Sequence, residues 1–194
     1  MDNIPNCYLL GIDPGSSSLG LAILELDSTT FSIVATTAYT IEATKLELFN
    51  TLDLRLPERE RRLRAISKAV GLCLEAYRPL TLAIESPFFN SRKPSAYAVL
   101  IETMYVLKQT ARTYDLNLPI IEVDPPTAKK AIGVRRLKAK ERRRLKLTTK
   151  DLVREALLPL TALKLTESID SLDEHSLDAI AVVYSSYKQI LARL

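Results

Sequence analysis

The chain has 194 residues, 47% hydrophobic and 26% charged, which is enough to bury a sizeable core without disulfides or a structural metal. Five glycines and ten prolines argue against a low-complexity chain, and no apolar run approaches the ~18 residues of a membrane span. The net charge of +4 combines one strongly basic segment with an acidic remainder. Cys7 and Cys73 lie in apolar runs, and we expect both to be reduced core residues of a cytosolic protein.

Three strands are predicted at the start of the chain. Residues 7–13 form a short apolar run that ends at Pro14-Gly15, which is typical of a buried strand. Two further β-rich runs, 20–26 and 31–41, are joined by a polar turn at 27–30. Because these connections are short, we expect an antiparallel meander.

Helices and strands then alternate. Residues 43–57 are irregular, with some helix, whereas 58–77 and 95–114 have apolar positions three and four residues apart and predict amphipathic helices. Short apolar runs at 80–85 and 119–124 predict two more strands, the second ended by consecutive prolines. Strands separated by helices pair in parallel, so the sheet is predicted to be mixed.

Two helices close the chain. Thr148 and Asp151 form a capping-box pattern before a helix that runs to Leu158, and a last helix starts at Asp173 or Glu174. The predicted fold is therefore a five-stranded mixed α/β sheet, three antiparallel strands followed by two parallel ones, flanked by helices. We expect residues 1–194 to form a single domain, with a basic insertion at about 129–150.

Three acidic residues and the chain's only histidine are placed to meet. Asp13 ends the first predicted strand and Glu85 the fourth, and ligands of open α/β sheets bind at the carboxyl ends of strands. His175 and Asp178 are three apart at the start of the last helix, so they share one face. Apolar residues follow them, which predicts that this end of the helix packs on the sheet.

Buried carboxylates that converge need a compensating partner. Three acids and one imidazole without a cysteine indicate a hard divalent cation, Mg²⁺ or Mn²⁺, and two ions would relieve the repulsion and suit an in-line phosphoryl displacement. Each residue also has an ordinary alternative: Asp13 as a turn acid, Glu85 as a loop cap, His175 as a hydrogen-bonded helix residue, and Asp178 as an ion-pair partner.

The positive charge is concentrated between Lys129 and Lys150. This segment has eleven basic residues and one acidic residue, a net +10, so the rest of the chain carries −6. A basic block on an acidic body is the electrostatic pattern of a phosphate-backbone binder. The alternative is a solvated charge run without a specific partner.

Four segments together resemble the RuvC-type Holliday-junction resolvases of the retroviral-integrase, or RNase H-like, superfamily: GIDPGSSSLGLAIL, LAIESPFF, PIIEVDPPTAKKAIG and EHSLDAIAVVY. The resemblance implies an RNase H-like fold, a homodimer, and Mg²⁺- or Mn²⁺-dependent cutting of two opposed strands of a four-way DNA junction. On this sequence it places the catalytic and metal-binding positions at Asp13, Glu85, His175 and Asp178. Asp173 and Glu174 would be substitutes if the helix register slipped.

The resemblance also implies DNA contacts. An aromatic after the glutamate reaches the junction centre in this family, and Phe88 or Phe89 takes that place here; we expect one of the two to be exposed and the other to be core. The remaining expected DNA-binding residues are all basic: Arg92, Lys93, Lys129, Lys130, Arg135, Arg136, Lys138, Lys140, Arg142, Arg143, Arg144 and Lys146. The helix at 95–114, with Tyr97, Met104 and Tyr105, is the candidate dimer surface, though these residues could equally be core.

Other functions remain open at this point. Asp13-Pro14-Gly15-Ser16 also resembles the first phosphate loop of actin-like ATPases, but no later glycine completes a second Asp-x-Gly loop. A nuclease of the same superfamily acting on flaps, other branched DNA or RNA–DNA hybrids, and a non-catalytic nucleic-acid-binding protein, are further alternatives. With no secretory leader at Met1–Asn6, we expect a cytoplasmic, nucleoid- or DNA-associated protein, or a viral protein acting in the host cytoplasm.

Overall fold

The fold is built on one mixed five-stranded sheet. The computed structural model describes residues 6–89, 94–135, 137, 141, 144–145 and 147–194. The sheet order is β3-β2-β1-β4-β5, with β1–β2 and β2–β3 antiparallel and β1–β4 and β4–β5 parallel, as predicted. The strands are β1 (Cys7–Asp13), β2 (Ser18–Leu26), β3 (Ile33–Glu42), β4 (Thr81–Glu85) and β5 (Ile120–Val123).

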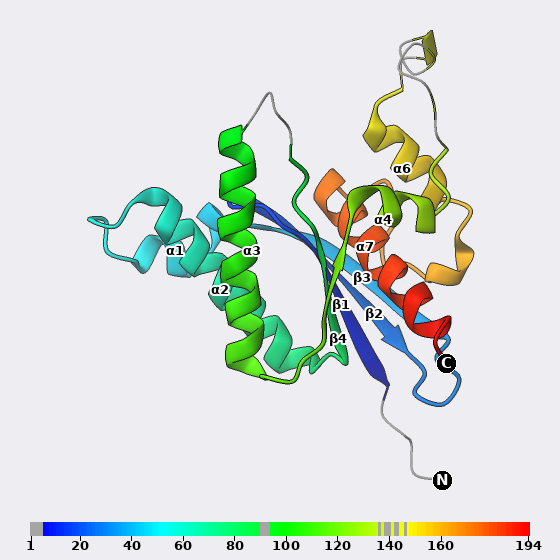
Figure 1. The fold of residues 1–194 in the computed structure, drawn as a ribbon, viewed down its shortest axis with the longest axis horizontal. Helices are drawn as coiled ribbons and strands as arrows, with labels where there is room; N and C mark the ends of the chain where they lie inside the picture. The colour runs from blue at the N-terminus through cyan, green and yellow to red at the C-terminus, as the bar shows by residue number, and fades with distance from the viewer. Residues whose placement is uncertain (1–5, 90–93, 136, 138–140, 142–143, 146) are drawn as a thin grey trace.

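Helices cover both faces of this sheet (Figure 1). The α-helices are α1 (Glu47–Thr51), α2 (Glu58–Tyr77), α3 (Pro94–Tyr114), α4 (Pro125–Ala131), α6 (Thr149–Leu157) and α7 (Glu174–Leu191), and two 3₁₀ turns are η1 (Ala43–Lys45) and η2 (Thr161–Leu163). Helices α2 and α3 lie on one face, and α7 lies on the other with α4 and α6 beside it. Among the described helices, none is long and apolar enough to cross a membrane.

Strand alternation divides the core into two clusters. Leu10 and Ile12 of β1 pack with α2 and α3, whereas Leu9 packs with α7. Successive side chains of a strand point to opposite faces, so the odd-numbered residues of β1 and β4 face α7. Asp13 and Glu85 both belong to this odd-numbered set, and their side chains are therefore directed to the α7 side of the sheet.

Two glycines allow α7 to lie directly on the sheet. A Cβ on Gly20 of β2 would come within 2.0 Å of the carbonyl oxygen of His175, and a Cβ on Gly11 of β1 would come within 2.5 Å of the Val183 Cβ. Neither contact is sterically possible, so both positions require glycine. The first turn of α7 is consequently held against the end of β1.

The structure corrects one sequence-based expectation about elements and confirms another. Pro125 and Pro126 do end a strand, but they also begin helix α4, where proline is favoured because its missing N–H would have no helical partner. Asp124 caps this helix by accepting a hydrogen bond from the Thr127 backbone N–H. The irregular stretch 43–57 contains the short elements η1 and α1, in agreement with the expectation of some helix.

Candidate active site

Asp13 and Glu85 are brought together by the register of two parallel strands. The β1–β4 ladder pairs Leu9 with Thr81 and ends with Ile12 beside Ile84. Asp13 and Glu85 are the next residues on each strand, so they lie side by side at the carboxyl edge of the sheet. Asp13 is 9% exposed, which is low for a carboxylate and requires compensating partners.

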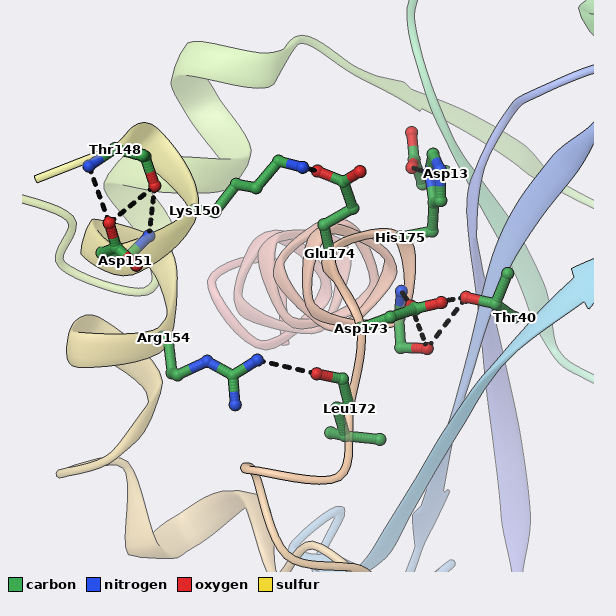
Figure 2. Close-up of polar contacts among 11 residues, drawn as sticks. Asp13, Thr40, Thr148, Lys150, Asp151, Arg154, Leu172, Asp173, Glu174 and His175 are labelled. Atoms are coloured by element: carbon green, nitrogen blue, oxygen red, sulfur yellow. Dashed lines mark hydrogen bonds and ion pairs between the residues drawn. The ribbon is translucent and has the colours of Figure 1, made fainter.

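Helix α7 supplies the other two predicted side chains. Asp173 caps the helix by accepting from the Ser176 backbone N–H, and this fixes the helical register. One residue into the helix, the Nδ1 of His175 lies 2.7 Å from the Oδ2 of Asp13 (Figure 2). Asp178 follows one turn later on the same face, half-buried.

Asp173 and Glu174 have other partners, so they do not take the places of His175 and Asp178 as a shifted helix register would require. Besides capping the helix, Asp173 accepts hydrogen bonds from the hydroxyls of Thr40 and Ser176. Glu174 forms an ion pair with Lys150 of α6. Figure 2 shows Thr40 and Lys150 on opposite sides of the first turn of α7.

The acidic groups shift the pKa values of one another and of His175. Burial, the negative charges of Asp13 and Asp178 and a hydrogen bond with Asp13 together raise the pKa of Glu85 to about 8, against the opposing charge of Lys129. Burial also raises the pKa of Asp178, against the opposing effect of Lys129. The hydrogen bond to Asp13 raises the pKa of His175, although burial opposes this shift. The positive charges of His175 and Lys129 therefore do not fully compensate the carboxylates at this edge of the sheet.

The donor set fits a hard divalent cation in chemical type. Three carboxylates and an imidazole with no thiol are the ligands that Mg²⁺ and Mn²⁺ accept, and a cation would relieve the repulsion that raises the pKa of Glu85. Within the described ranges, no three histidine, cysteine, aspartate or glutamate side chains already have an arrangement that could hold a metal ion. The Asp13–His175 hydrogen bond occupies one of the oxygens that a cation would need.

Only part of the predicted basic surface falls in the described residues. Lys129 and Lys130 lie on α4; Lys130 is exposed, while Lys129 is half-buried and its charge acts on both Glu85 and Asp178. Arg135 and Arg144 are exposed. The other predicted DNA-binding cations lie outside the described residues: Arg92, Lys93, Arg136, Lys138, Lys140, Arg142, Arg143 and Lys146.

Both phenylalanines after β4 are exposed. Phe88 is 69% and Phe89 56% exposed, so the expectation that one of them is core is wrong. The strand ends at Glu85 and the chain leaves the sheet there, which removes the neighbours that would cover a ring. Phe89 makes an edge-on contact with Tyr97 of α3, with ring centroids 5.3 Å apart. Phe88 has no such aromatic contact among the described residues.

Sequence reasoning missed the residues that position this site. Gly20 was read only as the start of a strand, and its close approach to His175 depends on a helix more than 150 residues away. Arg154 of α6 donates to the carbonyl oxygens of Ile169 and Leu172 and so fastens the segment that leads into α7. Neither contact is visible as a local pattern in the sequence.

Residues 9–185 match the sequence profile of the family described as "Crossover junction endodeoxyribonuclease RuvC". The chain belongs to the RuvC family. A RuvC protein of Thermomicrobium roseum is 29% identical over 129 residues, which cover 64% of this chain and 67% of that protein. The resemblance drawn from the four sequence motifs is thus confirmed.

Solved structures of resolvases share the fold. Thermus thermophilus RuvC in complex with a Holliday junction superposes with a TM-score of 0.62 at 20% identity, covering 95% of this chain and 96% of that one. The yeast mitochondrial Holliday junction resolvase Ydc2 gives 0.62 at 12% identity, covering 97% and 82%. The fowlpox virus Holliday junction resolvase gives 0.54 at 15% identity, covering 96% and 99%. The RuvC-type, RNase H-like fold class predicted from the sequence is confirmed.

Proposed function

We propose that this RuvC-family protein is an endonuclease that resolves four-way DNA junctions by paired phosphodiester hydrolysis, dependent on Mg²⁺ or Mn²⁺. One observation carries the proposal: Asp13, Glu85, His175 and Asp178 gather at one edge of the sheet, where three carboxylates lack sufficient positive charge. Fixed carboxylates of this kind cost stability in a plain binding protein, which favours a catalytic use.

In this proposal Asp13, Glu85 and Asp178 hold two divalent ions. When bound, the ions would supply Lewis-acid stabilisation of the phosphate charge and acidify a nearby water. His175 donates through Nδ1 to Asp13, so Nε2 is the ring atom left to position that water or take its proton. Lys129, held half-buried near Glu85 and Asp178, places a fixed positive charge where the scissile phosphate would lie.

The DNA would lie across the same edge of the molecule. The exposed ring of Phe88, three residues after Glu85, is free to stack on an unpaired base at the junction centre, a contact worth ~1–3 kcal/mol. The exposed cations Lys130, Arg135 and Arg144, with the basic residues outside the described ranges, would follow the phosphate backbone.

We also propose that the protein acts as a homodimer through α2 and α3. The predicted surface residue Tyr105 is 62% exposed, with Ile101 of α3 at 44% and Leu72 of α2 at 50%. Between these helices lies an open groove of about 480 Å³. Met104, included in that surface from the sequence, is only 4% exposed and belongs to the core. Two copies of one site would explain paired cuts on opposed strands.

The decisive test is incubation of the protein with a synthetic mobile four-way junction in Mn²⁺ or Mg²⁺. Symmetric paired nicks are expected, and Asp13→Asn should abolish them while junction binding in EDTA stays intact. Asp27→Asn, at a half-buried turn acid between β2 and β3, is the matched control that should cut normally. Cutting by Asp13→Asn would reject the assignment. Cuts confined to flaps, forks or RNA–DNA hybrids would indicate a broader nuclease, and binding without cuts would indicate a non-catalytic protein.

A further inference from the structure

One transverse row of the sheet meets the first turn of α7. Asp13 of β1 is paired with Gly20 of β2, and Gly20 is paired in turn with Thr40 of β3. Paired residues of neighbouring strands project to the same face, so the whole row is directed to α7. The side chain of Asp173 bonds Thr40, and the backbone carbonyl of His175 lies against Gly20. The ring of His175 then reaches Asp13.

The three contacts of this row differ in what they can hold. Gly20 permits the close approach of α7 but has no side chain with which to retain it. The hydrogen bond between His175 and Asp13 is part of the site itself, and it occupies an oxygen that a cation would need. The contact between Thr40 and Asp173 lies outside the metal-binding set, so a bound cation leaves it in place.

Thr40 joins two elements and is not needed for the helix cap. The Asp173 Oδ1 accepts a hydrogen bond from the Thr40 hydroxyl at 2.5 Å, and from the backbone N–H and the hydroxyl of Ser176, both at 2.9 Å. The two bonds from Ser176 are within α7 and cap the helix by themselves. Among the described residues, Thr40 is the only residue of the sheet that bonds Asp173. Loss of its hydroxyl should therefore detach the first turn from β3 and leave the cap intact.

The remaining polar contacts at the start of α7 come from α6. Arg154 donates to the Leu172 carbonyl oxygen, and Lys150 pairs with Glu174. Figure 2 shows Thr40 on the opposite side of the turn from these α6 residues. The first turn of α7 is thus held between α6 and β3, and Thr40 supplies the side that faces the strands.

We infer that Thr40 is a positioning residue of the candidate active site. By holding Asp173, it fixes the first turn of α7 against the sheet. His175 and Asp178 lie on the first two turns, so both remain beside Asp13 when a cation occupies that carboxylate. Thr40 acts through Asp173 and is not itself a ligand. The inference rests on the proposed function for its effect on cleavage, whereas its effect on His175 is a property of the metal-free protein.

Thr40→Val tests the link in the metal-free protein, because valine keeps the branched shape of threonine and lacks the hydroxyl. His175 is the chain's only histidine, so its imidazole gives a single set of NMR signals. The Nδ1 proton that bonds Asp13 should exchange with solvent roughly tenfold faster in the variant, since the loss of a hydrogen bond to a charged group shifts an equilibrium by about this factor or more. Thr40→Ser restores the hydroxyl and should restore slow exchange.

Thr30→Val is the matched control. Thr30, in the turn before β3, donates its hydroxyl to Asp27, which is the same kind of hydrogen bond at the far end of the strand. This variant should leave the exchange of the His175 proton unchanged. Thermal melting of each variant shows whether the fold is intact.

Metal binding gives the second readout. The Mg²⁺ concentration that half-saturates the change in the His175 signals should rise roughly tenfold in Thr40→Val, because groups that orient metal ligands change metal affinity by about this factor or more. The half-saturating Mg²⁺ concentration in single-turnover junction cleavage should rise equally. Junction affinity in EDTA should stay unchanged, and Thr40→Ser should restore the wild-type metal affinity.

A double substitution shows whether Thr40 acts through Asp173. In a protein that already carries Asp173→Ala, Thr40→Val should have no added effect on proton exchange or Mg²⁺ half-saturation, because its partner is absent.

The inference is overturned if folded Thr40→Val keeps slow exchange and the wild-type Mg²⁺ half-saturation, or if the two substitutions are fully additive. A failure of the proposed function gives a different result. In that case the wild-type chain does not cut junctions with Mn²⁺ or Mg²⁺, while the exchange of the His175 proton still reports whether Thr40 holds the first turn.

Discussion

The two faces of the sheet are built differently. On one face α7 lies directly against the strands, because Gly11 and Gly20 leave no Cβ between them and the helix. On the other face α2 and α3 are held by large side chains such as Leu74, Leu82 and Leu107. The first face places His175 within hydrogen-bond distance of Asp13, whereas the second leaves Ile101 and Tyr105 exposed. Close backbone packing positions the site, whereas side-chain packing leaves apolar residues of α3 exposed on the other face.

The largest loss of stability and cleavage should follow from adding a side chain at the contact between Gly20 and the start of α7. Gly20→Ala places a Cβ against the His175 carbonyl and forces the start of α7 away from β1, which should cost about 1–3 kcal/mol of stability. Junction cleavage should fall by at least about 10²-fold, because the carboxylates and His175 separate. Differential scanning calorimetry and single-turnover cleavage would measure the two effects.

Gly71→Ala is the matched control on the other face. Its Cβ would meet only the Thr110 Cγ2 at 3.7 Å, an ordinary contact. Alanine in a helix interior is favoured over glycine by about 0.5–1 kcal/mol, so this variant should be as stable as the wild type or more so. Equal effects of the two substitutions would contradict the contrast between the faces.

Stability of the metal-free protein should fall as pH rises. The pKa of Glu85 is raised by burial and by its acidic neighbours to about 8, from 4.5 when unperturbed. A raised pKa means that the stabilising contribution is complete below pH 4.5 and is lost as pH passes through 8. We expect a loss of up to about 5 kcal/mol in EDTA between these limits, measured by urea denaturation.

Two comparisons test whether Glu85 causes this fall of stability with pH. In Glu85→Gln the pH dependence of stability should be weaker, because the amide cannot ionise. Saturating Mg²⁺ should also weaken it, by stabilising the ionised carboxylates. If the free energy of unfolding of Glu85→Gln still falls as steeply with pH, the pH dependence comes from other groups.

The α2–α3 face should determine association without affecting the site. Ile101→Glu with Tyr105→Glu should weaken self-association by roughly 30-fold or more, since buried interface residues of this kind contribute about 2 kcal/mol. Analytical ultracentrifugation would measure the dissociation constant. Leu116→Glu, an equally drastic change at a residue 80% exposed outside this face, should have no effect. Unchanged association in the double variant would place the dimer interface elsewhere.

The smallest expected effect concerns Asp173, and it distinguishes a role as helix cap from a role as metal ligand. Asp173→Ala should lower stability by about 1 kcal/mol, because α7 loses the acceptor for the Ser176 N–H. Asp173→Asn keeps that acceptor and should retain both stability and cleavage. Loss of cleavage in Asp173→Asn, measured with the junction substrate, would show that Asp173 coordinates a cation after all.

Local patterns were sufficient for most elements. The helix at 58–77 and the capping box of Thr148 and Asp151 were predicted with their observed bounds, because apolar spacing and caps act over a few residues. Helix α4 was missed because consecutive prolines were read as a stop, although proline is equally suited to a first helical turn. The exposure of Phe88 and Phe89 was also beyond a local pattern, since it depends on which neighbours cover the rings.

The sequence by itself determined the strand ends that carry Asp13 and Glu85, the three-residue spacing of His175 and Asp178, and the position of the basic segment. Only the tertiary structure decided that Gly20 admits the first turn of α7, that Asp173 caps rather than joins the site, and that Lys150 and Glu174 face each other beside it. The reason is physical: helical and strand periodicity act between near neighbours, whereas Gly20 and His175, Thr40 and Asp173, and Lys150 and Glu174 are about 25 to more than 150 residues apart, and only packing sets their distances.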